Sequence, residues 1–370
     1  MPDDTPEMSR RTFLRAGAGV AGISTLEKGF FLGGQPSARP EEVDTVVVDS
    51  AASILSPEAP SDVLTRFVEQ MRQGGVSCAL GRVATSEDWP ATMVRILAYS
   101  PFLESLGLSS AKSVGEIQAA VKSGKIAVVF HCQGSYMLGS PFGVSRPMVS
   151  TFDIRRLLRV HELGVRVMQL TDDFKGYLGD GCTERTDCGL TDYGIWALRK
   201  MNEIGMLVDC SHAGYQTSMD AINMSRQPII FSHSNAKALC TNKRNITDEQ
   251  IRAVATNGGV IGITAAAEMV DANAPTVDRL LDHIDYVVHL AGIDHVGMGF
   301  GYSYETAATY TRLHRDTSAY RKPPWSYAIS DPTHISTVRT GLRARGYDEG
   351  SIRKVLGANF LRVFRQVWQA

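Results

Sequence analysis

The chain has 370 residues, of which 44% are hydrophobic and 21% charged, and its formal net charge is −1. This suits one large globular domain with short appendages, and it provides no electrostatic basis for binding nucleic acid or an anionic membrane surface. No apolar run reaches the roughly 18 residues that a membrane-spanning helix requires, so no transmembrane helix is expected in the mature chain.

The N-terminus has the pattern of an export signal. Residues 9–15, Ser-Arg-Arg-Thr-Phe-Leu-Arg, precede a small, apolar stretch, which is typical of the twin-arginine route. Residues 1–40 are therefore predicted to be a signal peptide and linker, and residues 41–370 the folded domain. Export by this route predicts a mature protein in the periplasm or outside the cell. It also implies that the chain folds before it crosses the membrane.

After residue 40, apolar strands alternate with helices about eight times. Strands are predicted at 43–49, 75–80, 125–131, 165–170, 205–212, 228–236, 259–264 and 295–299. Helices are predicted at 61–73 with Ser61 as the N-cap, 89–106, 114–123, 152–163, 191–204, 213–227, 247–256, 277–291, 333–345 and 349–367. The alternation predicts an α/β fold, a (β/α)8 TIM barrel.

Two consecutive predicted strands end in the same dipeptide. Ser211-His212 closes one strand and Ser232-His233 the next, with room for a single crossover helix between them. In a parallel barrel the strand ends share one rim, where ligands bind. A single histidine at a strand end is often a hydrogen-bonded core residue, but two in matching positions favour a metal site.

The cysteines give a less definite prediction. Cys182 and Cys188 flank a polar loop, so a local disulfide is open in an oxidising compartment. The other four cysteines lie in apolar contexts and are predicted to be buried thiols.

Several motifs together resemble the membrane (renal) dipeptidase family. The resemblance extends over about residues 43–368, and its motifs are the segments at 189–194, 206–212, 228–240, 244–245, 282–287, 292–297 and 355–364. It implies a zinc-dependent (β/α)8 barrel that hydrolyses small dipeptides with two metals bridged by a glutamate, often as a homodimer. His212 and His233 match two histidine ligands of one zinc. Arg244 matches an arginine that receives the substrate carboxylate, and Asn245 belongs to the same predicted substrate-binding segment.

Other positions depart from the family pattern. The His-x-Asp zinc ligands after the first strand fall on Ala51 and Ser53, and the bridging glutamate falls on Gln133. A substrate-facing histidine falls on Asp172, and the aspartate after the last strand falls on Gly301. Neither alanine nor a neutral amide can replace these ligands. The pattern predicts a site that has been remade or retired.

Nearby residues are candidates for a remade site. His131 lies two residues before Gln133 and would face the same side of a strand, as a third imidazole ligand beside His212 and His233. Such a set would hold one divalent metal, with zinc first and iron or copper as alternatives. Asp172 is the predicted general base, with Gln133 beside it, and Tyr302 is predicted to line the substrate pocket. For His131 and Asp172, a core histidine and a loop cap are the structural alternatives.

Three hypotheses remain open. The first is a one-metal hydrolase of a dipeptide or related amino-acid-derived amide that bears a carboxylate. The second is a lyase, isomerase or redox-metal enzyme on the same scaffold. The third is a non-catalytic binding protein that keeps the pocket and Arg244.

Overall fold

The computed structural model describes residues 46–52, 55, 59–85, 87–139, 152–302 and 326–368. The predicted export signal, Ser53 and the whole segment between Tyr302 and Ser326 lie outside these residues. In the described part of the chain, no helix is both long and apolar enough to cross a membrane.

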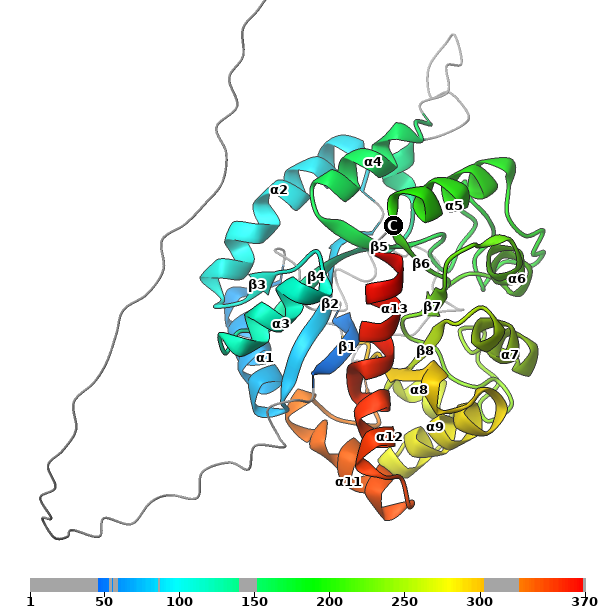
Figure 1. Cartoon of the computed structure of the whole chain (residues 1–370). Helices are drawn as coiled ribbons and strands as arrows, with labels where there is room; N and C mark the ends of the chain where they lie inside the picture. The colour runs from blue at the N-terminus through cyan, green and yellow to red at the C-terminus, as the bar shows by residue number, and fades with distance from the viewer. Residues whose placement is uncertain are drawn as a thin grey trace, which may run out of the picture. The chain divides into compact units, whose positions relative to one another are not determined.

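Eight parallel strands form the predicted barrel (Figure 1). In the order of pairing they are β1 (Val47–Ala52), β2 (Val76–Ala84), β4 (Ala127–Cys132), β5 (Val165–Gln169), β6 (Leu207–Asp209), β7 (Ile229–Phe231), β8 (Val260–Ile263) and β9 (Val296–Met298). A two-residue strand that the sequence did not predict, β3 (Ser109–Ser110), pairs with β4. The prediction of a (β/α)8 barrel is confirmed.

Side chains connect the first and last strands. Within the described residues the ladder runs from β1 to β9 without pairing these two strands. Ser50 Oγ instead donates to the backbone oxygens of Met298, at 2.9 Å, and Ser232, at 2.5 Å. Asp49 Oδ1 accepts a hydrogen bond from the backbone N–H of Phe300 at 3.0 Å. The seam of the barrel therefore depends on two buried polar side chains.

Helices surround the sheet, and most follow the predicted ranges. They are α1 (Ser61–Gln73), α2 (Trp89–Ser105), α3 (Val114–Lys122), α4 (Arg155–Glu162), α5 (Asp192–Ile204), α6 (Tyr215–Met224), α7 (Asp248–Thr256), α8 (Ala267–Val270), α9 (Val277–Ala291), α11 (Ser336–Ala344), α12 (Glu349–Arg353) and α13 (Asn359–Val367). The N-cap prediction for α1 is wrong: Pro60 occupies that position, no side chain caps the helix, and Ser61 is already helical.

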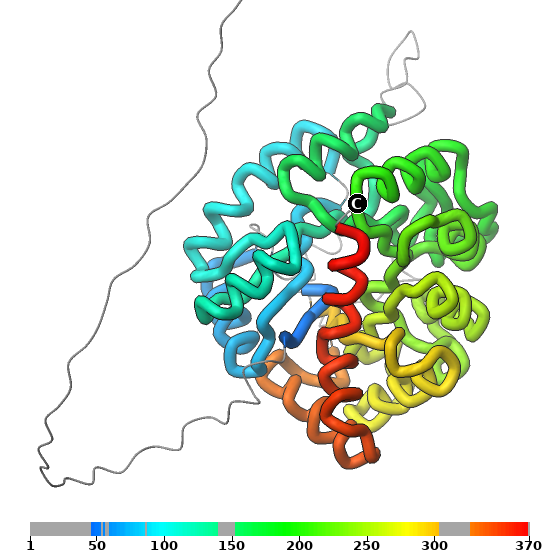
Figure 2. Tube along the Cα trace, in the orientation of Figure 1, coloured from blue at the N-terminus to red at the C-terminus, as the bar shows by residue number. Residues whose placement is uncertain are grey.

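The predicted C-terminal helix is interrupted. A π-helical turn, Lys354–Ala358, separates α12 from α13, with a non-helical backbone at Gly357. A side chain there would collide with the start of β1, because a Cβ on Gly357 would lie 2.1 Å from the oxygen of Val46, which precedes the strand, and 3.1 Å from the nitrogen of Val48. The close approach lets α13 cross the barrel opening, as the red ribbon in Figures 1 and 2 shows.

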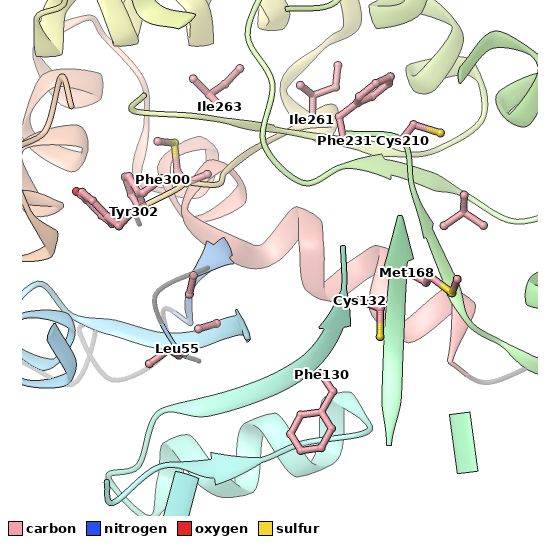
Figure 3. Packing of buried hydrophobic residues seen from close by; sticks show 14 of the residues in the cluster. Leu55, Phe130, Cys132, Met168, Cys210, Phe231, Ile261, Ile263, Phe300 and Tyr302 are labelled. Carbon is pink, nitrogen blue, oxygen red and sulfur yellow. The ribbon is translucent and has the colours of Figure 1, made fainter. Parts of the chain in front are cut away.

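The core has two layers. Inward-facing strand residues such as Val129 and Leu207 form one buried cluster with Phe360 and Phe364 of α13, so α13 closes the interior of the barrel. The larger cluster lies between the sheet and the outer helices. Figure 3 shows part of that layer, including Phe231.

Candidate active site

Four consecutive strands deliver the candidate site residues to one rim. Gln133 follows β4, Asp172 follows β5, His212 follows β6 and His233 follows β7. The register brings these ends together, since Gln169 of β5 pairs with Asp209 of β6. The rim is at the carboxyl ends of the strands, where barrel enzymes place their chemistry.

The two histidines face one another. His212 Nε2 and His233 Nε2 are 2.9 Å apart, and the ring centroids are 4.9 Å apart. His212 has φ of 73°, and it is the one described residue other than glycine with a positive φ. Backbone strain of this kind concentrates at functional sites, because the surrounding structure must hold the residue in place.

Asp173 holds the other side of His212. Its Oδ1 lies 2.7 Å from His212 Nδ1, 3.0 Å from Arg244 Nε and 3.3 Å from Cys182 Sγ. Burial alone would raise the pKa of this carboxyl. The facing His212 and Arg244 outweigh burial and hold its pKa well below the usual range. Asp173 is therefore a fixed anion that can only accept hydrogen bonds.

A second buried carboxylate, Asp209, is linked to His233 through the hydroxyl of Ser232. Asp209 Oδ2 accepts from Ser232 Oγ at 2.5 Å, and Ser232 Oγ is 2.8 Å from His233 Nδ1. Although burial opposes ionisation, hydrogen bonds and nearby histidines keep the pKa of Asp209 well below its usual range. Burial, with the charges of His212 and Arg244, lowers the pKa of His233 well below 6.5.

These residues fit a bound cation. Each histidine has its Nδ1 atom occupied, by Asp173 or by Ser232, while the two Nε2 atoms face one another at 2.9 Å. Two nitrogen lone pairs at that distance repel unless they share a proton or a metal. Imidazoles whose second nitrogen is hydrogen-bonded to a carboxylate or hydroxyl are usual zinc, iron or copper ligands. A second group, Asp172, Asp173 and His212, also has ligand atoms close enough together to hold a metal ion, and there both carboxylates contact His212 Nδ1.

The predicted third imidazole lies elsewhere. His131 Nε2 is 3.2 Å from Asp209 Oδ2, the same carboxylate oxygen that Ser232 contacts. His131 is buried. The described structure thus places it as a partner of Asp209 rather than as a third member of the histidine pair.

Gln133 and Asp172 do meet. Gln133 Nε2 donates to Asp172 Oδ1 at 3.3 Å, and its Oε1 accepts from Arg82 at 3.3 Å. Asp172 Oδ1 is also 3.2 Å from His212 Nδ1. The Gln133 amide therefore orients the neighbouring carboxylate.

Tyr302 is separate from this group. Its ring stacks near Phe300, at 5.9 Å between centroids, and packs against Tyr327 at 4.8 Å. Its hydroxyl donates to the backbone oxygen of Ile329, and only 4% of the residue is exposed (Figure 3). The described contacts are those of a core residue, in place of the predicted pocket lining.

A cavity of about 180 Å³ adjoins His212, between the rim and helices α6 and α7. Arg244, Asn245 and Ser234 line it, and each has a buried polar atom with no partner in the described structure: Nη1, Oδ1 and Oγ respectively. The two Asn245 Nδ2 bonds, to the oxygens of Cys240 and Met269, fix the orientation of its amide. The cavity thus offers unused donors and acceptors.

Sequence reasoning missed Asp173 and Ser232. Asp173 directly follows the predicted base, and Ser232 directly precedes a predicted ligand, so adjacency was the available signal. The thiols are also clarified: Cys182 and Cys188 are both free, and Cys182 donates to Asp173.

The family comparison agrees with this architecture. The sequence profile described as Membrane dipeptidase (Peptidase family M19) matches residues 67–370. The chain belongs to this family. It is thereby a hydrolase-family barrel whose relatives are dipeptidases and whose family is metal-dependent.

Individual relatives are distant. Dipeptidase verJ of Clonostachys rogersoniana is 28% identical over 288 residues, which are 77% of this chain and 67% of that protein. An uncharacterized dipeptidase of Schizosaccharomyces pombe is 32% identical over 190 residues, 50% of this chain and 43% of that protein.

Solved structures share the fold of this family member. An amidohydrolase from Pseudomonas aeruginosa superposes with a TM-score of 0.78 at 26% identity, covering 89% of this chain and 98% of that one. A metallo peptidase from Rhodobacter sphaeroides, liganded with a phosphinate mimic of the dipeptide L-Ala-D-Ala, gives a TM-score of 0.69 at 20% identity, covering 88% and 100%. At that identity the second likeness shows the fold alone.

Proposed function

We propose that this dipeptidase-family protein hydrolyses a dipeptide or a related amino-acid-derived amide with a single metal held by His212 and His233. The observation that carries the proposal is the facing of their Nε2 atoms at 2.9 Å, with each Nδ1 already engaged. A metal in that position supplies a water that is nucleophilic at neutral pH and polarises the amide carbonyl.

The two neighbouring carboxylates, Asp172 and Asp173, have different roles in this proposal. Asp173 is occupied by His212 and Arg244, and its low pKa makes it a poor proton acceptor. Asp172 is the general base in this proposal, because its carboxylate is partly exposed at the rim and Gln133 orients it. It takes the proton of the attacking water and returns it to the departing amine.

Arg244 binds the substrate carboxylate. Nε of Arg244 is held by Asp173, while its Nη1 has no hydrogen-bond partner among the described residues, and Arg244 lines the cavity. Lys237 and Lys243 add positive charge to the same lining. The volume of the cavity is that of about six water molecules, which suits one small amino-acid unit with a free carboxylate.

The test compares three proteins: wild type, the double variant His212→Ala/His233→Ala, and His289→Ala, which removes an exposed imidazole on α9. We expect one zinc, iron or copper ion per chain in the wild type and in His289→Ala, and none in the double variant. Hydrolysis of dipeptides should follow the metal. Two metals per chain would contradict the single-metal site, and no metal would contradict the hydrolase.

A second candidate function is binding, or non-hydrolytic chemistry, in the same pocket. It is favoured by the replacements at the old ligand positions: Ala51 is buried and apolar, Gln133 is neutral and Gly301 has no side chain. Calorimetric binding of a dipeptide without turnover by the metal-loaded protein would favour this candidate.

We also propose export by the twin-arginine route, on the basis of residues 9–15. The substitutions Arg10→Lys and Arg11→Lys together should leave a fused reporter in the cytoplasm, whereas the unaltered signal should carry it across the membrane. Export that persists in the double variant would contradict the assignment.

A further inference from the structure

Ser232 lies between a buried carboxylate and a ring nitrogen of the histidine pair. Its Oγ is 2.5 Å from Asp209 Oδ2 and 2.8 Å from His233 Nδ1. A third neighbour, Ser211 Oγ, is farther away at 3.2 Å. Ser232 is fully buried, so no solvent competes for these contacts.

The hydroxyl has one proton to donate, and the distances decide where it goes. Asp209 is an ionised carboxylate and can only accept. An O···O separation of 2.5 Å without a hydrogen between the atoms would be strongly repulsive, so Ser232 donates to Asp209. Its oxygen must then accept from His233, which places a proton on His233 Nδ1.

We propose that Ser232 is a positioning residue that fixes the tautomer of His233. The proton then lies on Nδ1, and the lone pair lies on Nε2, the nitrogen that faces His212. Asp209 acts through Ser232, as Asp173 acts directly on His212. The two ligands of the proposed metal thus receive their orientation from two different carboxylates, one of them through a hydroxyl relay.

The surroundings of Asp209 support this assignment. Its Oδ1 accepts from the backbone N–H groups of Ser211, at 2.9 Å, and Ser232, at 3.0 Å. Its Oδ2 accepts from Gln169 at 3.0 Å, with His131 Nε2 at 3.2 Å. A carboxylate with this many donors stays ionised and fixed in place, which is what a relay requires.

The backbone of His233 is held independently. Its N–H donates to Ser211 Oγ at 3.0 Å. Removal of the Ser232 hydroxyl therefore leaves the main chain anchored and releases the ring nitrogen alone, so a tautomer change can be separated from misfolding.

The experiment measures which ring nitrogen of His233 carries the proton, by nitrogen-detected NMR of metal-free protein with labelled histidine. The wild type should show a single tautomer with the proton on Nδ1. In Ser232→Ala, His233 should become a mixture of tautomers, and zinc affinity, measured by competition with a chromophoric chelator, should fall about 10- to 100-fold. Ser232→Thr keeps the hydroxyl and should restore both properties.

Ser234→Ala is the matched control. Ser234 flanks His233 on its other side and is equally buried, but its Oγ makes no hydrogen bond in the described structure. This variant should keep the wild-type tautomer and zinc affinity. The inference is overturned if Ser232→Ala retains the single Nδ1–H tautomer, or if Ser234→Ala produces the same change.

The inference rests on the proposed histidine-held metal, yet the two can fail separately. The tautomer is read without metal or substrate. A protein that shows the expected tautomer shift but hydrolyses no amide would contradict the proposed hydrolysis and leave the relay intact.

Discussion

Asp172 and Asp173 are neighbours in the chain with different surroundings. Asp173 is enclosed by Arg244, His212 and the thiol of Cys182, whereas Asp172 faces the rim beside Gln133. A sequence motif cannot separate such neighbours, because the turn after β5 decides which carboxylate enters the barrel. This is why Asp172 was predicted to act and Asp173 was missed.

Arg244→Lys tests the substrate carboxylate site. Lysine keeps the charge but loses the planar fork that reaches both Asp173 and the cavity. Loss of a charge-assisted hydrogen bond, about 1.5–3 kcal/mol, should raise KM for a dipeptide about 10- to 100-fold with a smaller effect on kcat.

The control for that variant is a dipeptide amide, which lacks the terminal carboxylate. Its already weak binding should change little between wild type and Arg244→Lys. An equal loss for both substrates would show that Arg244 acts through Asp173 and His212 instead.

Tyr302→Phe separates the predicted pocket role of Tyr302 from its observed packing. The substitution keeps the ring contacts with Phe300 and Tyr327 and removes the hydrogen bond to Ile329. We expect unfolding to become easier by about 1 kcal/mol, with KM unchanged. A rise in KM without loss of stability, measured by urea unfolding, would support the predicted role of Tyr302 in the substrate pocket and contradict a purely structural role.

At the scale of elements, strands and helices were predictable because their patterns are local. Ser61–Gln73 and Val277–Ala291 match the predicted helices, and the capping box at Thr247 marks the start of α7. The break between α12 and α13 was not predictable. It arises from contact with β1, about 300 residues earlier, which no local pattern records.

Gly357→Ala tests that contact. A Cβ at this position would lie 2.1 Å from the oxygen of Val46 and 3.1 Å from the nitrogen of Val48, both backbone atoms. We expect destabilisation by about 3 kcal/mol or more, measured by urea unfolding. Gly115→Ala in α3 is the control: its Cβ has no neighbour closer than 3.8 Å, so helix propensity should make it neutral or stabilising by up to about 1 kcal/mol.

At the scale of the whole molecule, the seam between β1 and β9 depends on Asp49. Burial raises the pKa of this carboxyl from 3.8 to about 6, even though backbone N–H groups of Ala51 and Phe300 favour its ionised form. The folded protein therefore binds a proton more tightly than the unfolded chain between these values. Stability from this group is complete below pH 4 and is lost as the pH rises through about 6.

Asp49→Asn should remove that dependence. Asparagine keeps an oxygen acceptor for Ala51 and Phe300 and does not ionise. As the pH rises from 4 to 7, the unfolding free energy of the metal-free variant should increase relative to that of metal-free wild type, by up to about 3 kcal/mol. The control is Glu104→Gln, at an exposed carboxylate, whose plot of unfolding free energy against pH should be parallel to that of wild type. A parallel plot for Asp49→Asn would contradict the assignment.

Closure of the barrel by α13 has a consequence for how the protein is made. Inward-facing residues such as Val129 and Leu207 are covered by Phe360 and Phe364, which the ribosome adds long after the strands themselves. Until residues 359–367 have been synthesised, that end of the barrel has no cover, and an arrested nascent chain would expose the apolar side chains of its interior to chaperones and proteases.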